Sequence, residues 1–190
     1  CTINTQNFTI NQNPAFKNKV IRCLFCDKQN QIWIGTSDGL FVYNQQINSY
    51  KYYNTNNSNL SHNTIRTIYQ TQNGNIYIGT YNMLNVFSNG AFKSFNLKGN
   101  YKPMLQNNLV LDIAPYNNLT DSLLWIGTET GLCLFNTNTG NYKLYNTQNT
   151  NLSNEIIKCI HTQNNTLWLG TDFGLAILDP KTNNITTYYH

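Results

Sequence analysis

Residues Gln31 to Thr36 read Gln-Ile-Trp-Ile-Gly-Thr, and the chain repeats this phrase three more times with small changes. The later copies are Asn75 to Thr80, Leu124 to Thr128 and Leu167 to Thr171. The glycine of each copy marks the spacing, and these glycines are Gly35, Gly79, Gly127 and Gly170. The intervals are 44, 48 and 43 residues (79 − 35, 127 − 79 and 170 − 127). A period in the forties, carried by β-branched and aromatic residues, indicates one supersecondary unit used four times.

Each repeat contains four short runs of strand-forming residues separated by turn residues, with no helical period, which predicts a four-stranded antiparallel sheet. The predicted strands cover residues 20–26, 31–36, 40–43 and 50–53 in the first repeat, 64–70, 75–80, 84–87 and 91–95 in the second, 109–114, 123–128, 132–135 and 142–145 in the third, and 156–161, 166–171, 175–178 and 185–189 in the fourth.

The repeated phrase also selects among all-β folds. In Ile32-Trp33-Ile34 both alternating faces of the strand are apolar, so both faces of the sheet must be covered. A β-propeller does this by placing each blade between two neighbours. We therefore predict one all-β domain, residues 1–190, of four β-propeller blades at about 19–59, 60–103, 104–151 and 152–190.

Two positions of the phrase have predicted structural roles. The rings fill the wedge between blades, and they are Trp33, Tyr77, Trp125 and Trp168. The glycines beside them, at positions 35, 79, 127 and 170, allow close approach of the backbone.

The sequence does not decide whether the four blades close into a ring. Residues 5–10 read as the outer strand of a preceding blade, and an open arc of four blades would expose apolar faces at both ends. We expect the chain to be a segment of a larger propeller, of the seven-bladed type, or to associate with a second copy as a homodimer. A self-contained four-bladed ring is the alternative.

Composition excludes several classes of partner. Only 11% of the residues are charged, the net charge is +4, and Lys and Arg are scattered, so a nucleic-acid partner is not expected. No apolar run approaches the roughly 18 residues that cross a membrane, so no membrane contact is expected except a lipid anchor at Cys1. For Cys1 we favour the interpretation that the chain begins there by chance, with the lipid anchor as the alternative. The other four cysteines are expected to be buried free thiols.

No catalytic set, metal site or cofactor motif is evident, so an enzyme is not predicted. His62, His161 and His190 fall in different repeats. The sharper hypothesis concerns Arg22, Arg66 and Lys158, which share one position of the first strand, where the third repeat has Leu111. If that strand lines the central channel, these cations could receive an acidic sugar or another anionic ligand. The alternative is that each side chain simply extends into solvent.

A second candidate surface consists of the loops that join one blade to the next. These loops gather at one end of the rigid blades, where binding specificity normally resides, and they are residues 54–63, 96–108 and 146–154.

The fourth repeat carries a recognisable pattern. Asn154, Ile157, Ile160, Leu-Trp-Leu-Gly-Thr at 167–171 and Gly174-Leu175, followed by the strand at 185–189, resemble the two-component regulator propeller repeat. The resemblance implies the periplasmic sensor region of a Bacteroidetes-type hybrid histidine kinase, in a family where many members respond to polysaccharide fragments. The second repeat departs from the pattern with Tyr81-Asn82-Met83-Leu84, which puts its hairpin geometry in doubt.

The function we predict is that of a ligand-sensing propeller segment on the periplasmic or extracellular side of the bacterial envelope, binding oligosaccharide or an anionic glycan without catalysis. One alternative is a stand-alone surface lipoprotein that acts as a binding or adhesion scaffold. A second alternative is a propeller lyase or hydrolase, which rests on analogy between folds alone.

Overall fold

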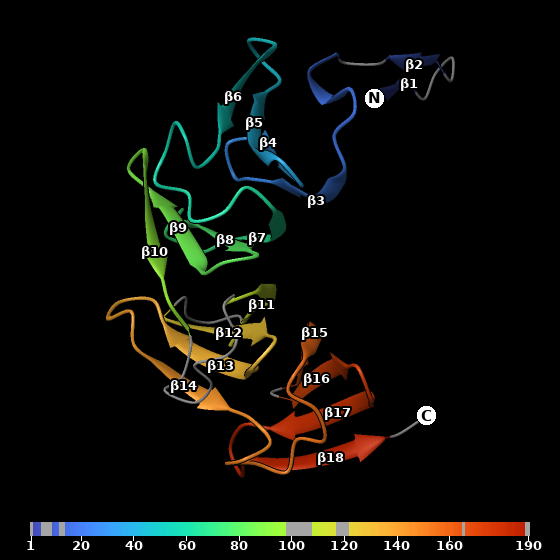
Figure 1. Cartoon of the computed structure of the whole chain (residues 1–190), viewed down its shortest axis with the longest axis vertical. Coiled ribbons are helices and arrows are strands. Elements are labelled where there is room, and N and C mark those ends of the chain that lie inside the picture. Colours follow the sequence, from blue (N-terminus) through green and yellow to red (C-terminus); the bar gives the residue numbers. More distant parts are fainter. Residues whose placement is uncertain are drawn as a thin grey trace.

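The four repeats fold as four separate four-stranded antiparallel sheets, which follow one another along an open arc (Figure 1). The computed structural model describes residues 2–4, 9–11, 14–97, 108–116, 122–164 and 166–188. The prediction of β-propeller blades is confirmed. Cys1 and His190 lie outside the described residues.

The strands of the first two blades follow the chain from the inner to the outer edge of each sheet. In the first blade they are β3 (Ile21–Cys26), β4 (Gln31–Thr36), β5 (Gly39–Asn44) and β6 (Ser49–Tyr53). In the second they are β7 (Ile65–Gln70), β8 (Ile76–Thr80), β9 (Leu84–Ser88) and β10 (Ala91–Phe95).

The last two blades repeat this order. The third comprises β11 (Val110–Pro115), β12 (Leu123–Thr128), β13 (Gly131–Asn136) and β14 (Tyr142–Tyr145). The fourth comprises β15 (Ile157–Gln163), β16 (Thr166–Thr171), β17 (Gly174–Asp179) and β18 (Asn184–Tyr188).

The arc has a concave edge formed by the innermost strands. Strands β3, β7, β11 and β15 lie in succession along it, each in contact with the next. In Figure 1 the first and fourth blades stand apart at the two ends of the arc. The four blades therefore do not form the self-contained ring that the sequence left as an alternative.

A small sheet precedes the first blade. Strands β1 (Thr2–Asn4) and β2 (Thr9–Asn11) pair antiparallel, and the short 3-10 helix η1 (Pro14–Phe16) follows them. The sequence predicted a single outer strand at 5–10. The structure instead has β2 as one member of a pair, while residues 5–8 lie outside the described part.

The cores lie between the blades. Three clusters of buried side chains occupy the three junctions between successive sheets. Trp33, Tyr77 and Trp125 each lie in the cluster between their own blade and the next, so burial of these rings joins the sheets to one another. Apolar area removed from water contributes roughly 25 cal/mol per Å², which makes these junctions the main source of stability.

Trp168 is different, because no further blade follows within the described chain. It exposes 37% of its surface, whereas Trp125 at the equivalent position of the third blade exposes 0%. The opposite end of the arc shows the same effect. Leu24 on β3 exposes 67%, but its counterpart Ile68 on β7, covered by the first blade, exposes only 9%.

The structure corrects part of the expectation that the cysteines are buried. Cys133 is buried and Cys23 is half-buried, but Cys26 and Cys159 are exposed. Cys159 occupies the position of Cys23 on β15, where the missing neighbour leaves it uncovered. The expectation of buried thiols is therefore wrong for Cys26 and Cys159.

The threonine that ends each repeated phrase fixes the following hairpin. Thr36 Oγ1 accepts a hydrogen bond from Asp38 N at 3.0 Å and donates one to the Gly39 carbonyl at 2.8 Å. The same pair of bonds is made by Thr80, Thr128 and Thr171 in the other blades. A buried hydroxyl thus satisfies two backbone groups in each turn.

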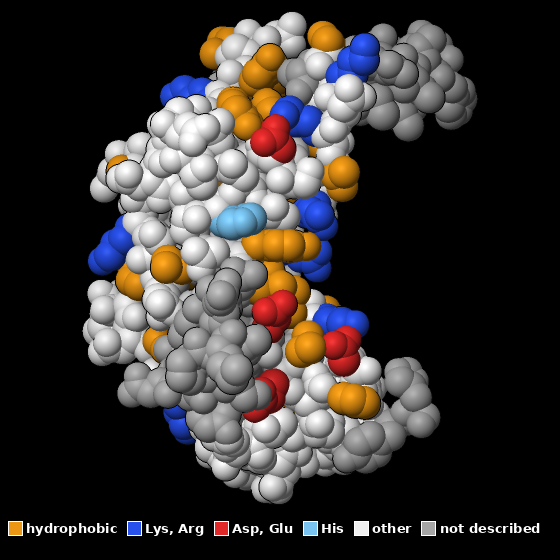
Figure 2. Space-filling model, viewed as in Figure 1, with side chains coloured by type: hydrophobic (Ala, Val, Ile, Leu, Met, Phe, Trp, Pro, Cys, Tyr) orange, Lys and Arg blue, Asp and Glu red, His pale blue; other side chains and the backbone are white. Residues whose placement is uncertain are grey.

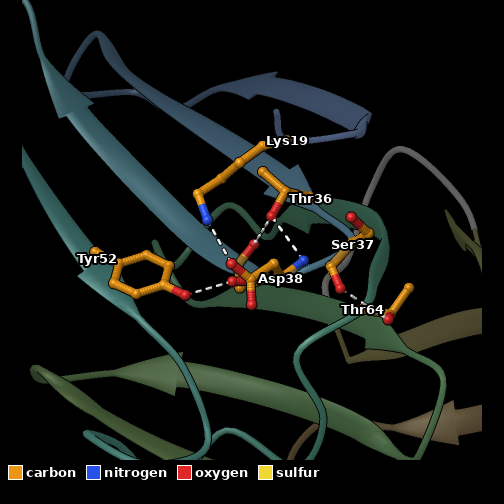
Figure 3. Close-up of polar contacts among 7 residues, drawn as sticks. Lys19, Thr36, Ser37, Asp38, Tyr52 and Thr64 are labelled. Carbon is orange, nitrogen blue, oxygen red and sulfur yellow. Dashed lines mark hydrogen bonds and ion pairs between the residues drawn. The ribbon is translucent and has the colours of Figure 1, made fainter. Parts of the chain in front are cut away.

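The first of these turns carries additional polar contacts (Figure 3). Lys19 forms an ion pair with Asp38, and the Tyr52 hydroxyl donates to the Asp38 carbonyl. Thr64, at the entrance to the second blade, donates to the Ser37 carbonyl at 3.2 Å. The turn is therefore tied to its own outer strand and to the next blade.

Candidate functional site

The predicted ligand residues lie on irregular positions of the innermost strands. The pairing of each such strand with its neighbour shifts between the first residue and the third, which leaves one extra residue between them. The extra residues are Arg22, Arg66, Leu111 and Lys158. These side chains belong to the concave edge and stand beside the loop end of the blades.

The structure brings two of the three predicted cations together. The guanidinium carbon of Arg22 lies 5.5 Å from the ring centroid of Tyr81, and that of Arg66 lies 6.0 Å from the same centroid. The imidazole of His62 stacks on this ring as well, at 5.8 Å and an interplanar angle of 20°. We call Arg22, Arg66, Tyr81 and His62 the Arg–Tyr cluster.

The cluster joins two blades. Arg22 belongs to the first blade, whereas Arg66 and Tyr81 belong to the second, and His62 lies in the connection between them. The His62 Nδ1 accepts a hydrogen bond from Thr64 N at 2.9 Å, which holds the imidazole beside the tyrosine. Its four side chains are therefore positioned by rigid strands and by one fixed connection.

The cluster is positively charged. Within the described ranges of the chain, neither Arg22 nor Arg66 has a carboxylate within ion-pair distance. Arg22 is exposed, but the Nε of the half-buried Arg66 is shielded from solvent and has no hydrogen-bond acceptor. A cation that has lost part of its hydration interacts more strongly with an anion than a fully solvated one.

Lys158 is not part of this cluster. It lies two blades away and forms an ion pair with Asp172 of its own blade. Figure 2 shows basic side chains without acidic neighbours in the middle of the concave edge, and basic and acidic side chains together farther down. The predicted set of three cations is thus divided into a pair and a separate ion pair.

Tyr81 and His62 are the members that sequence reasoning missed. The departure of the second repeat at Tyr81 was visible, but it was interpreted only as a doubt about the hairpin. The hairpin is in fact retained, with Met83 at φ 79° where Gly39, Gly131 and Gly174 also have positive φ. The available signal was an aromatic residue in a turn of the same length as in the other repeats. This residue directly follows the strand that pairs with the strand of Arg66.

The connections between blades lie at the same end as the cluster. Gly39 N donates to the Asn63 carbonyl at 2.7 Å, and Met83 N donates to the Asn108 carbonyl at 2.8 Å. Each connection therefore binds the central turn of the preceding blade. Most of the predicted loop at 96–108 lies outside the described residues, namely 98–107.

A groove of about 200 Å³ lies at the opposite end of the first two blades. Its lining includes Gln31, Gln70 and Asn75 together with the rings of Trp33 and Phe87. Backbone and side-chain donors of Lys28 cross from the first blade to Gln70 and Gln72 of the second, at 2.9 Å each. The groove therefore offers neutral hydrogen-bonding groups beside aromatic surface.

The buried carboxylate of Asp27 and the half-buried carboxylate of Asp112 have structural partners. Asp27 accepts hydrogen bonds from Trp33 Nε1 at 2.8 Å and from the backbone of Gln29 and Gln31. Asp112 accepts from the backbone N of Ile160 at 2.7 Å, across the junction between the third and fourth blades. Burial raises the pKa of Asp112, although its hydrogen bonds act in the opposite direction. Both side chains connect strands or blades.

No group of three or more metal-ligating side chains occurs among residues that the structure describes. None of the described helices is long and apolar enough to span a membrane.

Comparison with known families adds an independent finding. Residues 15–38 and 59–82 match the family described as two component regulator propeller. These two segments are therefore similar to two-component regulator propeller repeats. The two matched segments are the inner halves of the first and second repeats, and they include Arg22, Arg66 and Tyr81. No match was found among curated protein sequences.

Solved structures resemble this repeat array over most of its length. The extracellular domain of BT4673 from B. thetaiotaomicron, described as a hybrid two-component system, is 28% identical with a TM-score of 0.78 over 90% of this chain and 22% of that one. The corresponding domain of BT3049 is 21% identical, with a TM-score of 0.76, over 91% of this chain and 25% of that one. The repeat array thus spans no more than a quarter of either domain.

A more distant likeness concerns an enzyme. Virginiamycin B lyase from Staphylococcus aureus is 12% identical, with a TM-score of 0.68, over 90% of this chain and 56% of that one. At this identity the likeness extends to the propeller fold alone.

Proposed function

We propose that the chain is an extracytoplasmic sensor segment of a hybrid two-component system, which binds oligosaccharide and passes the signal by a change in domain arrangement. The observation that carries this proposal is the 28% identity to the extracellular domain of BT4673 over 90% of the chain. The two matched propeller repeats support the same assignment. Sensing on the outer side of the membrane follows from the location of that domain.

The polar groups of the described chain favour binding over catalysis. The carboxylates of Asp27 and Asp112 are occupied by hydrogen bonds, within the first blade for Asp27 and between the third and fourth blades for Asp112. The Arg–Tyr cluster offers charge and aromatic surface, and the Nδ1 of its histidine, His62, is occupied by the hydrogen bond from Thr64 N. The likeness to a lyase adds no catalytic residue, since it concerns the fold alone.

A panel of neutral and acidic oligosaccharides tests this function on the purified chain. Thermal unfolding measures stabilisation by each glycan, and mass spectrometry measures whether the glycan is recovered intact. We expect at least one glycan to raise the unfolding temperature in a saturable way and to remain uncleaved. Absence of any stabilisation across the panel, or cleavage of a glycan, would contradict the proposal.

We also propose that the exposed ends of the arc are covered by further blades or by a second copy of the chain. Leu24 and Trp168 belong to positions that are buried or half-buried wherever a neighbouring blade is present. Light scattering of the purified chain tests this, with concentration-dependent association as the expected result. Association should weaken when Trp168→Gln reduces the apolar surface of one end. A monomer at all concentrations would argue that the ends need no cover.

A further inference from the structure

We infer that the Arg–Tyr cluster is a binding site for one anionic group, a carboxylate or a sulfate, carried by an acidic oligosaccharide. The ligand class rests on the proposed function, whereas the anion site itself rests on the geometry of Arg22, Arg66 and Tyr81.

Arg22 and Arg66 concentrate positive charge beside Tyr81. Two guanidinium groups lie within 6.0 Å of one ring centroid and share no carboxylate within ion-pair distance in the described part of the chain. The electron-rich face of a tyrosine attracts each cation weakly, but it does not neutralise either charge. An anion between the two guanidiniums relieves their mutual repulsion and gains two charge-assisted interactions.

The fourth blade provides an internal comparison. There the cation at the same bulge position, Lys158, is paired with Asp172, the residue directly after the repeated phrase. In the first two blades the residues at that place are Ser37 and Tyr81, which carry no charge. The anionic group of a ligand would therefore take the role that the carboxylate of Asp172 plays beside Lys158.

The nearest acidic candidates are committed elsewhere. Asp38, in the turn after β4, is paired with Lys19. Asp112 accepts hydrogen bonds from Ile160 N at 2.7 Å and from Ile113 N at 2.9 Å, and its contact with the Thr67 hydroxyl is 3.4 Å long. Neither carboxylate is available to neutralise the two arginines.

The remaining features favour a sugar as the carrier of the anion. Planar guanidinium forks match a carboxylate or sulfate in two contacts each, which selects such groups over chloride. The stacked rings of Tyr81 and His62 add a flat apolar surface beside the charge, a combination typical of sites that hold ring-shaped ligands. The hydrogen bond from Thr64 N to His62 fixes this surface before a ligand arrives.

Isothermal titration with defined glycans tests the site. The probes are trigalacturonic acid, its methyl ester as an uncharged counterpart, a sulfated disaccharide, and sodium acetate. We expect trigalacturonic acid or the sulfated disaccharide to bind, the methyl ester to bind at least about tenfold more weakly, and binding to weaken with added salt. Acetate tests whether the site binds any simple anion. A glycan site should bind the oligosaccharide far more tightly than it binds acetate.

Variants assign the binding to the cluster. Arg22→Gln and Arg66→Gln should each weaken binding about tenfold or more, because each removes one charged fork. Arg66→Lys keeps the charge and should give an intermediate loss, which separates lost recognition from lost folding. Lys158→Gln is the matched control, since it removes a cation from the same bulge position and should leave the affinity unchanged.

The outcomes separate this inference from the proposed function. Equal binding of the acid and its methyl ester, or equal loss in Lys158→Gln and Arg66→Gln, would overturn the anion site. Binding of neutral oligosaccharides alone would also overturn it while leaving oligosaccharide sensing intact. Failure of every glycan in the larger panel would instead remove the proposed function itself.

Discussion

Gly127 lies directly against Ile157 of the next blade, so closely that an added β-carbon would stand 2.7 Å from the Ile157 carbonyl oxygen. The contact joins the third and fourth sheets at their inner edges. The equivalent Gly170 of the fourth blade meets only Cys159 of its own sheet, because no blade follows it in the described chain. Gly127 therefore allows close contact between two blades, whereas Gly170 at the equivalent position contacts only its own blade.

This difference predicts unequal effects of alanine. Gly127→Ala should lower the free energy of unfolding by about 2 kcal/mol or more, because a backbone atom of the next blade must move. Gly170→Ala should cost less than about 1 kcal/mol, since only an exposed cysteine side chain must turn away. Urea unfolding of both variants measures this, and equal losses would contradict the assignment of Gly127 to the blade junction.

The turn of the second repeat should gain stability from glycine. Met83 has φ 79°, a left-handed conformation that costs an L residue roughly 1–2 kcal/mol. Met83→Gly removes this cost but increases the entropy of the unfolded chain, so we expect a net gain of up to about 1 kcal/mol. Thermal unfolding measures it. Gly131→Ala, at φ 136° and facing the Tyr145 carbonyl, is the opposite change and should destabilise.

Asp27 should matter more for stability than an exposed aspartate in a similar turn. Asp27→Ala removes the acceptor of the buried Trp33 Nε1–H and of two backbone N–H groups, at a cost of about 3 kcal/mol. Asp179→Ala is the control, because Asp179 also caps a turn through Lys181 N but is exposed to solvent. Comparable denaturation midpoints for the two variants would show that Asp27 is not a central acceptor.

The cysteines should react with alkylating reagents in a defined order. Burial raises the pKa of Cys133 to about 12 and that of Cys23 to about 11, so at pH 8 roughly one Cys23 thiol in a thousand is ionised. Cys26 and Cys159 are exposed. Iodoacetamide followed by peptide mapping should find Cys26 and Cys159 modified first, and early modification of Cys133 would be inconsistent with the structure.

Stability should depend on pH through Asp112. Burial raises its pKa in the folded state above the ordinary value of 3.8, so the folded chain holds this proton more tightly than the unfolded chain. The stabilising contribution is complete below about pH 3.8 and is lost as the pH rises through the folded pKa. The wild-type chain should therefore lose stability relative to Asp112→Asn between pH 4 and pH 7. Urea unfolding at both pH values measures the difference, and a constant difference would argue against the buried carboxylate.

Much of the fold was predictable because the repeated phrase is locally unambiguous. Strand β4 matches its predicted range at residues 31–36, and β16 does so at 166–171. Both consist mainly of aliphatic and aromatic residues and end in Gly-Thr. The hairpin pair β1 and β2 was predicted only in part, since Thr2 to Asn4 is a short polar stretch whose pairing depends on a partner beyond the next few residues.

The site was predicted less completely, for a physical reason. The shared position of Arg22 and Arg66 could be read from the register of the repeats, but their distance to Tyr81 depends on how one blade packs on the next. The pairing of Lys158 with Asp172 likewise depends on a turn conformation. Contacts between blades are set by three-dimensional packing, which the spacing along the chain does not encode directly.

The extra residue in each innermost strand can change independently of the residues that pair in the sheet. Since this residue is left out of the pairing between strands, a change from Arg22 to the Leu111 or Lys158 type alters the concave edge of the arc without altering the sheet beneath it. An array of such blades can therefore acquire a new chemical preference by single substitutions, one per blade, and each substitution leaves the buried junctions intact. The sheets stay the same while the extra residue of each innermost strand varies, and duplication of a blade adds one more such residue.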